Sequence, residues 1–132
     1  MDSKMKKKSI ADLLEVMQNL RDPNSGCEWD KYQTSKTLIP FLREETEEVV
    51  EAIKKNDPDN LKEELGDLLF QIIFHSEIAK EKKLFNFDDV VDNLSKKLIR
   101  RHPYVFEQKR KHSLKEQESM WKKIKQEEKF KK

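Results

Sequence analysis

Residues 58–82 read PDNLKEELGDLLFQIIFHSEIAKEK, and this stretch predicts the central helix of the molecule. Asp57 lies directly before Pro58, which is the pairing of a capping acid with the residue favoured at the first helical position. Apolar side chains recur at helical spacing and cover almost the whole circumference between Leu65 and Phe74. A helix that is apolar on every side is expected to be buried. We therefore expect the rest of the chain to pack around this helix.

The flanking sequence predicts four more helices and no strand, so the expected fold class is all-α. Each of these helices shows apolar side chains at helical spacing next to a capping or breaking signal. The expected ranges are 10–20 behind Ser9, about 37–56, about 89–101 behind Asp88 and before His102-Pro103, and about 114–129 behind the capping box of Ser113 and Glu116. Residues 27–36 lack a clear period, and we expect an ordered loop there that Trp29 anchors.

Composition agrees with a single domain and excludes several classes of protein. The 132 residues are enough for one compact domain, and two glycines with four prolines are too few for a turn-rich β architecture. The chain is 41% charged and 35% hydrophobic, which resembles a disordered sequence, but the helical periodicity argues for a folded one. We expect a flexible basic lead-in over 1–8, one domain over 9–129 and a frayed tail over 130–132.

Charge and cysteine content bear on partners and compartment. Lys and Arg number 28 against 26 Asp and Glu, a balance that does not favour a nucleic acid polymer as partner. Cys27 is the one cysteine, which suits a reducing compartment. The most apolar run, 68–74, is far too short to cross a bilayer, and no signal-peptide core follows the basic start. We expect a cytoplasmic protein without a membrane partner.

Four carboxylates fall on the apolar stripes of two predicted helices. Glu45 and Glu48 share a stripe on the helix over 37–56, and Glu64 and Asp67 lie three apart on the next helix. Burying bare carboxylates together costs too much free energy unless a cation compensates their charge. Oxygen-only donors favour Mg²⁺, with Mn²⁺ as a substitute, and Mg²⁺ is commonly completed by substrate phosphates. The spacing therefore predicts a metal site for a phosphorylated substrate.

Simpler interpretations of the same residues stay open. Acidic runs on helices are usually solvated faces, although a solvated face should not coincide with an apolar stripe. His75 lies near the acidic line, where a lone histidine is more often a hydrogen-bonded core residue than a ligand. Lys97 and Arg101 are four apart near the inner face of their helix. They either hold phosphate oxygens or extend into water.

Seven blocks of sequence in a fixed order resemble the MazG nucleotide pyrophosphohydrolase family. They span most of the chain and comprise LRDP (20–23), GCEWD (26–30), QT (33–34), REETEEV (43–49), EELGDLLFQ (63–71), RRHPYVF (100–106) and WKKIKQEEK (121–129). The sequence departs from the family pattern at Glu28, where proline is common, and at Tyr104, where histidine is common. The resemblance implies an all-α helical bundle completed by oligomerisation, Mg²⁺ dependence, and hydrolysis of nucleoside triphosphates to monophosphate and pyrophosphate.

The resemblance also implies roles for individual residues. The implied metal ligands are Glu45, Glu48, Glu64 and Asp67, the implied catalytic acids are Glu44, Glu45 and Glu48, and the implied substrate-binding residues are Lys97, Arg101 and Trp121. In the expected mechanism water attacks the α-phosphorus in line, and either Glu45 or Glu48 accepts its proton. Lys97 and Arg101 would neutralise charge on the leaving pyrophosphate.

Three alternative functions are considered, and the sequence also leads to an expected oligomeric state. A narrower relative acting on dCTP, dUTP or phosphoribosyl-ATP would share the chemistry, and a noncatalytic helical interaction module would not bind Mg²⁺. A ferritin-like oxidase is disfavoured, because its Glu-x-x-His motif is missing at the site. We expect a homodimer or a dimer of dimers, because one chain has too little apolar surface elsewhere to cover the helix over 58–82.

Overall fold

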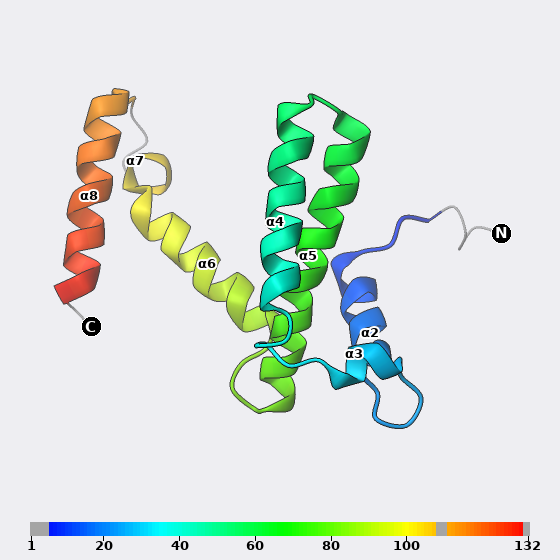
Figure 1. The fold of residues 1–132 in the computed structure, drawn as a ribbon. Helices are drawn as coiled ribbons and strands as arrows, with labels where there is room; N and C mark the ends of the chain where they lie inside the picture. The colour runs from blue at the N-terminus through cyan, green and yellow to red at the C-terminus, as the bar shows by residue number, and fades with distance from the viewer. Residues whose placement is uncertain (1–5, 108–110, 131–132) are drawn as a thin grey trace. The chain divides into compact units, whose positions relative to one another are not determined.

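The computed structural model describes residues 6–107 and 111–130, and every regular element within them is a helix (Figure 1). The helices are α2 (Ile10–Leu20), α3 (Glu28–Tyr32), α4 (Ile39–Lys54), α5 (Pro58–Glu81), α6 (Phe87–Arg101), α7 (Pro103–Phe106) and α8 (Leu114–Phe130). The predicted all-α class is confirmed. None of the helices in the described ranges is both long and apolar enough to cross a membrane.

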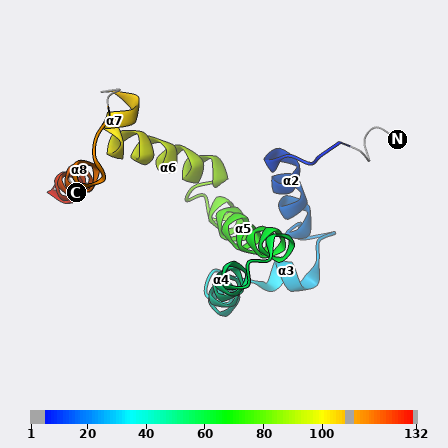
Figure 2. The ribbon, with the colours of Figure 1, turned by 90° about the horizontal axis from the view of Figure 1, so that it is seen from above.

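The described residues fall into two compact units, one up to Phe87 and one from Asp88 onward. In the first unit α4 and α5 run side by side in opposite directions, and α2 lies along the later part of α5 (Figures 1 and 2). The fully buried core is built from Met17, Leu38, Ile73, Phe74 and Ile78. The single domain expected over 9–129 stays a prediction.

The helix over 58–82 is found as predicted, but it is buried along only part of its length. Asp57 accepts a hydrogen bond from the backbone N–H of Asn60 and so caps α5, as its place before Pro58 indicates. All buried side chains of α5 lie between Gln71 and Ala79. Leu65 is 49% exposed, so the expectation of burial is wrong for the first half of the helix. The reason is that α2, with 11 residues, is too short to cover the 24 residues of α5.

The ends of several elements differ from the sequence-based expectation. The segment over 27–36 contains the short helix α3, and α4 begins at Ile39 instead of Thr37. Asp88 does not cap α6, which already begins at Phe87, and α7 was not expected. The predicted cap of α2 at Ser9 is present and forms a capping box with Asp12, and the predicted capping box of Ser113 and Glu116 precedes α8. Helix α8 includes Phe130, which was expected in the tail.

Arg21 fixes the segment between α2 and α4 against α5. Its Nη1 donates to the carbonyl oxygens of Asp30 and Gln33, both at 2.8 Å, and its Nε donates to Glu81 at 2.9 Å. The guanidinium also lies over the ring of Phe74, 5.6 Å from its centroid. The tight turn before α3 needs Gly26, because a Cβ there would lie 2.4 Å from the carbonyl oxygen of Leu20. These contacts hold the segment that carries Trp29 next to α5.

Candidate metal centre

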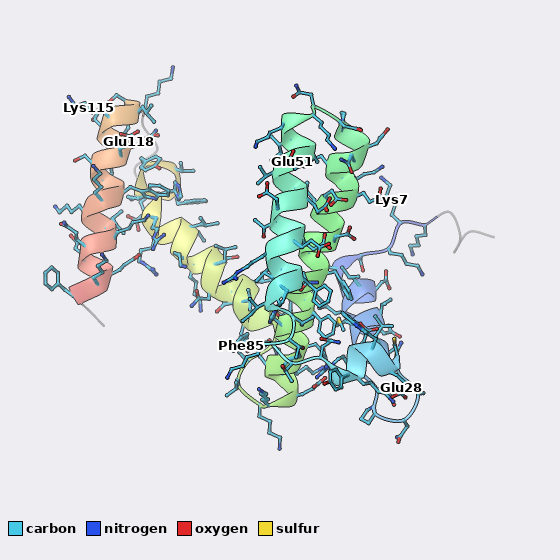
Figure 3. The ribbon with its side chains drawn as sticks, in the orientation of Figure 1. Lys7, Glu28, Glu51, Phe85, Lys115 and Glu118 are labelled. Atoms are coloured by element: carbon cyan, nitrogen blue, oxygen red, sulfur yellow. The ribbon has the colours of Figure 1, made fainter. Side chains whose placement is uncertain are left out.

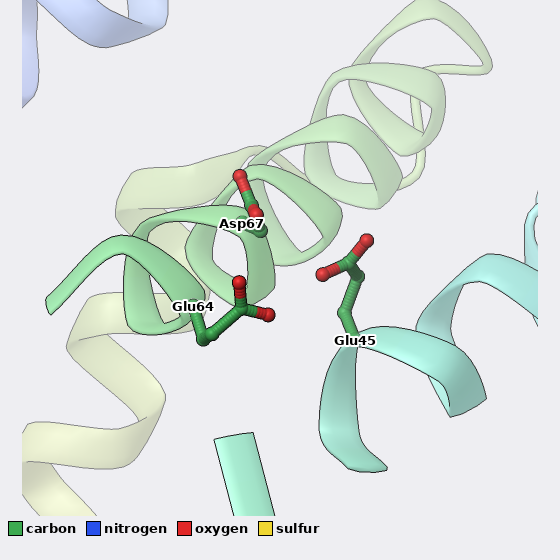
Figure 4. Close-up of side chains that lie close together, drawn as sticks. All are labelled: Glu45, Glu64 and Asp67. Carbon is green, nitrogen blue, oxygen red and sulfur yellow. The ribbon is translucent and has the colours of Figure 1, made fainter. Parts of the chain in front are cut away.

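Three carboxylates converge between α4 and α5. One oxygen each from Glu45 on α4 and from Glu64 and Asp67 on α5 lie within 4.8 Å of one another (Figure 4). The two α5 residues are three apart and so lie on one face of the helix. Glu45 points toward this face from α4. Figure 3 shows side-chain oxygens gathered where the two helices run side by side. The convergence agrees with the predicted pairing of acids from two helices.

Two of these carboxylates have raised pKa values. Desolvation is the largest cause for both Glu45 and Glu64, since partial burial disfavours the charged form. Like charges add to the shift: Asp67 raises the pKa of Glu45 most among the neighbours, and Glu48 raises that of Glu64 most. Repulsion among the carboxylates is therefore uncompensated within this cluster.

The other predicted acids lie beside the three. Glu48 lies next to the cluster: its negative charge, and a hydrogen bond that it accepts from protonated Glu64, raise the pKa of Glu64. Glu44 lies close enough to raise the pKa of Glu45 but contributes no oxygen to the convergent group. The expectation that four carboxylates are buried is wrong, because Glu48 and Asp67 are exposed and the other two are half-buried. The buried side chains of α5 all lie after the acidic residues, from Gln71 onward, and the buried residue of α4 is Ala52.

The donor set suits a hard divalent cation. All converging atoms are carboxylate oxygens, which Mg²⁺ and Mn²⁺ accept and which zinc and copper sites rarely use alone. Within the described parts of the chain, no lysine or arginine forms an ion pair with Glu45, Glu64 or Asp67. A divalent ion held by these residues would supply the missing positive charge.

The predicted substrate residues belong to the second unit. Arg101 Nη2 lies 2.9 Å from Glu128 Oε1 on α8, and Arg100 Nε lies 2.6 Å from the other oxygen. These hydrogen bonds, that of Arg101 first, lower the pKa of Glu128 to about 2. Lys97 is half-buried. The role of Lys97 and Arg101 in binding triphosphate stays a prediction, and the Glu128 pairing was missed.

Trp121 also lies in the second unit. Its ring is partly exposed, Lys125 Nζ lies 4.6 Å from the ring centroid, and the ring of His102 lies 6.0 Å away. These contacts place a cation on one aromatic face, an arrangement that stabilises a tryptophan at a surface. Its predicted place near the nucleotide stays a prediction.

A further polar pair follows the acidic residues along α5. His75 Nδ1 lies 3.0 Å from Ser35 Oγ, as expected of a hydrogen-bonded core histidine. Its other nitrogen, Nε2, and the side-chain oxygen of Gln71 are buried, and neither has a hydrogen-bond partner. Sequence analysis placed His75 near the acidic line and assigned Gln71 no function. The signal that could have found it was a polar residue inside an apolar run.

Comparisons with known proteins agree with this geometry. The model of the MazG nucleotide pyrophosphohydrolase domain matches residues 33–106, which include all the converging carboxylates. The chain is 48% identical over 120 residues to the nucleoside triphosphate pyrophosphohydrolase of Escherichia coli K12, covering 91% of this chain and 46% of that protein. It is 47% identical over 121 residues to the nucleoside triphosphate pyrophosphohydrolase/pyrophosphatase MazG of Thermotoga maritima, covering 92% and 46%.

A solved structure is also similar. The crystal structure of a mazG-related protein from Thermotoga maritima superposes with a TM-score of 0.70 at 31% identity, covering 85% of this chain and 97% of that one. The chain spans less than half the length of the two curated relatives described above. Over the matched domain, the sequence, the helical fold and the convergent carboxylates lead to one conclusion: the chain belongs to the MazG nucleotide pyrophosphohydrolase domain family.

Proposed function

We propose that this chain hydrolyses nucleoside triphosphates at the α-phosphorus, releasing a nucleoside monophosphate and pyrophosphate, in a reaction that depends on Mg²⁺ or Mn²⁺. The observation that carries the proposal is the convergence of Glu45, Glu64 and Asp67 without a cation from the chain. The names of the E. coli and T. maritima relatives support the same reaction. The cytoplasm stays the predicted compartment.

Each group of residues has a part in the proposed reaction. Glu45, Glu64 and Asp67, with Glu48 beside them, would hold the cation. The bound cation would supply positive charge for the α-phosphate and the leaving pyrophosphate and make a nearby water more acidic. Glu45 or Glu48 would accept the proton of the attacking water. Glu44 would contribute negative charge at the edge of the proposed metal site.

We also propose that the working unit is a homodimer or a dimer of dimers. In the isolated chain several large apolar side chains of α4 and α5 are more than a third exposed, among them Phe41, Ile53, Leu65 and Ile72. Soluble monomers rarely leave that much apolar surface open along neighbouring helices. Light scattering at micromolar concentration tests the assembly. A species of 15.9 kDa with full activity would contradict it.

The activity is tested by incubating the chain with a panel of ribo- and deoxyribonucleoside triphosphates and Mg²⁺, with pyrophosphate and phosphate measured separately. We expect pyrophosphate and monophosphate as the products. Diphosphate with phosphate would contradict attack at the α-phosphorus. Activity confined to dCTP, dUTP or phosphoribosyl-ATP would identify the narrower relative, and no activity with no effect of Mg²⁺ on thermal unfolding would identify an interaction module.

A further inference from the structure

Two buried polar atoms on α5 lack the hydrogen bonds that such atoms normally have. Gln71 is 5% exposed, and its side-chain oxygen has no partner; His75 Nε2, one turn later, is in the same state. Buried side-chain polar atoms are nearly always paired, because an unpaired one loses its bonds to water without replacing them. A pair of such atoms on consecutive turns therefore points to a partner that the isolated chain does not contain.

The pair continues the line of the metal carboxylates. Gln71 follows Asp67 by four residues and His75 follows Gln71 by four, so the three share one face of α5. At 1.5 Å per residue, Gln71 lies about 6 Å and His75 about 12 Å along the helix from Asp67. A molecule with its phosphate at the carboxylates and its body along this face would reach both residues.

The chemistry of the pair selects a neutral partner with its own donors and acceptors. Gln71 offers a carboxamide, which both donates and accepts, and His75 offers one ring nitrogen because Ser35 occupies the other. Burial lowers the pKa of His75, so its ring is neutral at pH 7 and does not attract a phosphate by charge. Base edges and sugar hydroxyls of a nucleoside have the matching groups.

The surroundings of the pair are aromatic. The ring of Trp29 lies edge-on to Phe41, with centroids 5.4 Å apart, and to Phe74, at 6.4 Å. Phe41 is one turn before Glu45 on α4, and Phe74 is three residues after Gln71 on α5. Trp29 is nevertheless 46% exposed. A large ring that contacts both helices and is open to solvent on one side offers a face on which a flat ligand can stack.

We propose that Gln71 and His75 form the nucleoside-binding part of the site and hydrogen-bond the base edge or the sugar hydroxyls of the nucleotide. The inference rests on the proposed function for the position of the phosphates. Because both polar atoms are closed to solvent, binding requires the segment that carries Trp29 and Ser35 to move.

The first test is a ligand-binding experiment with the wild-type chain. The NMR signals of the Gln71 side-chain amide and the His75 ring are monitored as each ligand is added. The probes are AMP, GMP, CMP and UMP, their deoxy counterparts, and inorganic tripolyphosphate as a ligand without a nucleoside. We expect at least one monophosphate to shift the Gln71 amide and tripolyphosphate to leave it unchanged. A difference between ribo and deoxy forms would assign the contact to the sugar, and a difference among bases would assign it to the base.

The second test is Gln71→Met, which removes both polar atoms at similar volume. We expect the ratio of kcat/KM between the best and the worst triphosphate to fall about tenfold, with the melting temperature unchanged or raised. Ser76→Ala is the matched control, because Ser76 is also buried on α5 but donates to the carbonyl oxygen of Ile72 at 2.9 Å. The control should keep the wild-type ratio.

The outcomes separate the inference from the proposed function. If the wild-type chain releases pyrophosphate while no monophosphate shifts Gln71, or if Gln71→Met lowers the rates of all triphosphates by one factor, the inference is wrong and the activity stands. If monophosphates shift Gln71 but no triphosphate is cleaved, the nucleoside contact stands and the proposed activity is wrong.

Discussion

Carboxylates in this chain have two opposite environments, one at the cluster between α4 and α5 and the other at Glu128 on α8. Between α4 and α5, Glu45 and Glu64 have only like charges near them, and their pKa values are raised. On α8, Glu128 lies between Arg100 and Arg101, and its pKa falls to about 2. The first group leaves its charge to be neutralised by something from outside, whereas the second is neutralised by the chain itself.

The two groups also respond to pH with opposite signs. A carboxylate with a raised folded-state pKa stabilises the fold below its ordinary pKa, and this contribution is lost as the pH rises through the raised value. A carboxylate with a lowered pKa stabilises the fold above its ordinary value, and this contribution is lost as the pH falls. Without a cation, the α4–α5 cluster therefore lowers the free energy of unfolding at neutral pH, whereas the ion pairs of Glu128 raise it.

The largest effect is expected from removing one charge of the α4–α5 cluster. Asp67→Asn should lower kcat/KM for the best triphosphate by about a hundredfold or more, because one of the charges proposed to hold the cation is lost. The melting temperature without metal should stay the same or rise, because a repulsive charge is removed. Glu47→Gln is the matched control, because Glu47 lies on the opposite side of α4 from Glu45. Its kcat/KM should stay within about twofold of wild type. A normal rate for Asp67→Asn would place the metal elsewhere.

The next effect is the response of stability to Mg²⁺. At a concentration one hundred times the dissociation constant, a ligand that binds only the folded state adds about 2.7 kcal/mol to the free energy of unfolding. We expect this gain, measured as a rise in melting temperature, for the wild-type chain and for Glu128→Gln. Asp67→Asn should show little of it. A rise of equal size in all three would show that Mg²⁺ binds outside the carboxylate cluster.

Acid unfolding of the second unit tests the other half of the comparison. Glu128→Gln should unfold more easily than wild type at pH 7, and the difference should shrink as the pH falls from about 4.5 toward 2, where half of wild-type Glu128 is protonated. Fluorescence of Trp121 in a Trp29→Phe background follows this unit alone, in a urea titration at each pH. Glu127→Gln, the preceding exposed residue, should match wild type throughout. A constant difference at all pH values would show that the ion pairs do not matter.

The sequence predicted features that depend on local chemistry and failed where packing decides. The caps at Ser9, Asp57 and Ser113 and the convergence of Glu45 with Glu64 and Asp67 follow from short-range spacing, and the structure has them. Burial of the carboxylates was wrong, because helical phase shows which side of a helix is apolar but not whether another element covers it.

The partners of individual side chains were equally hidden. Arg21 lies 60 residues from Glu81, and Arg101 lies 27 residues from Glu128, separations at which no sequence period indicates contact. The short helices α3 and α7 were missed for another reason, since five and four residues are too few to show an apolar repeat.

The smallest effect is expected at Gly66, which lies between the cluster residues Glu64 and Asp67. A Cβ at this position would meet nothing within 4 Å in the chain, so the structure of one chain gives no steric reason for glycine in the middle of α5. Glycine in a helix interior costs about 1 kcal/mol relative to alanine. Gly66→Ala should therefore raise the free energy of unfolding of the dilute, metal-free chain by about that amount, measured by urea titration.

The same variant tests whether a partner covers the carboxylate cluster of α4 and α5, in contrast to Glu128, whose charge is neutralised within the chain. If a second copy of the chain or the nucleotide approaches α5 closely at Gly66, the added methyl group should weaken dimer formation or raise KM while the isolated chain gains stability. Leu65→Ala, next to it, removes apolar surface without adding a group and is the control for the dimer. If Gly66→Ala gains stability and leaves both KM and the dimer unchanged, neither a second chain nor the nucleotide binds closely to α5 at Gly66. The face of α5 around Gly66 is then exposed in the working protein as well.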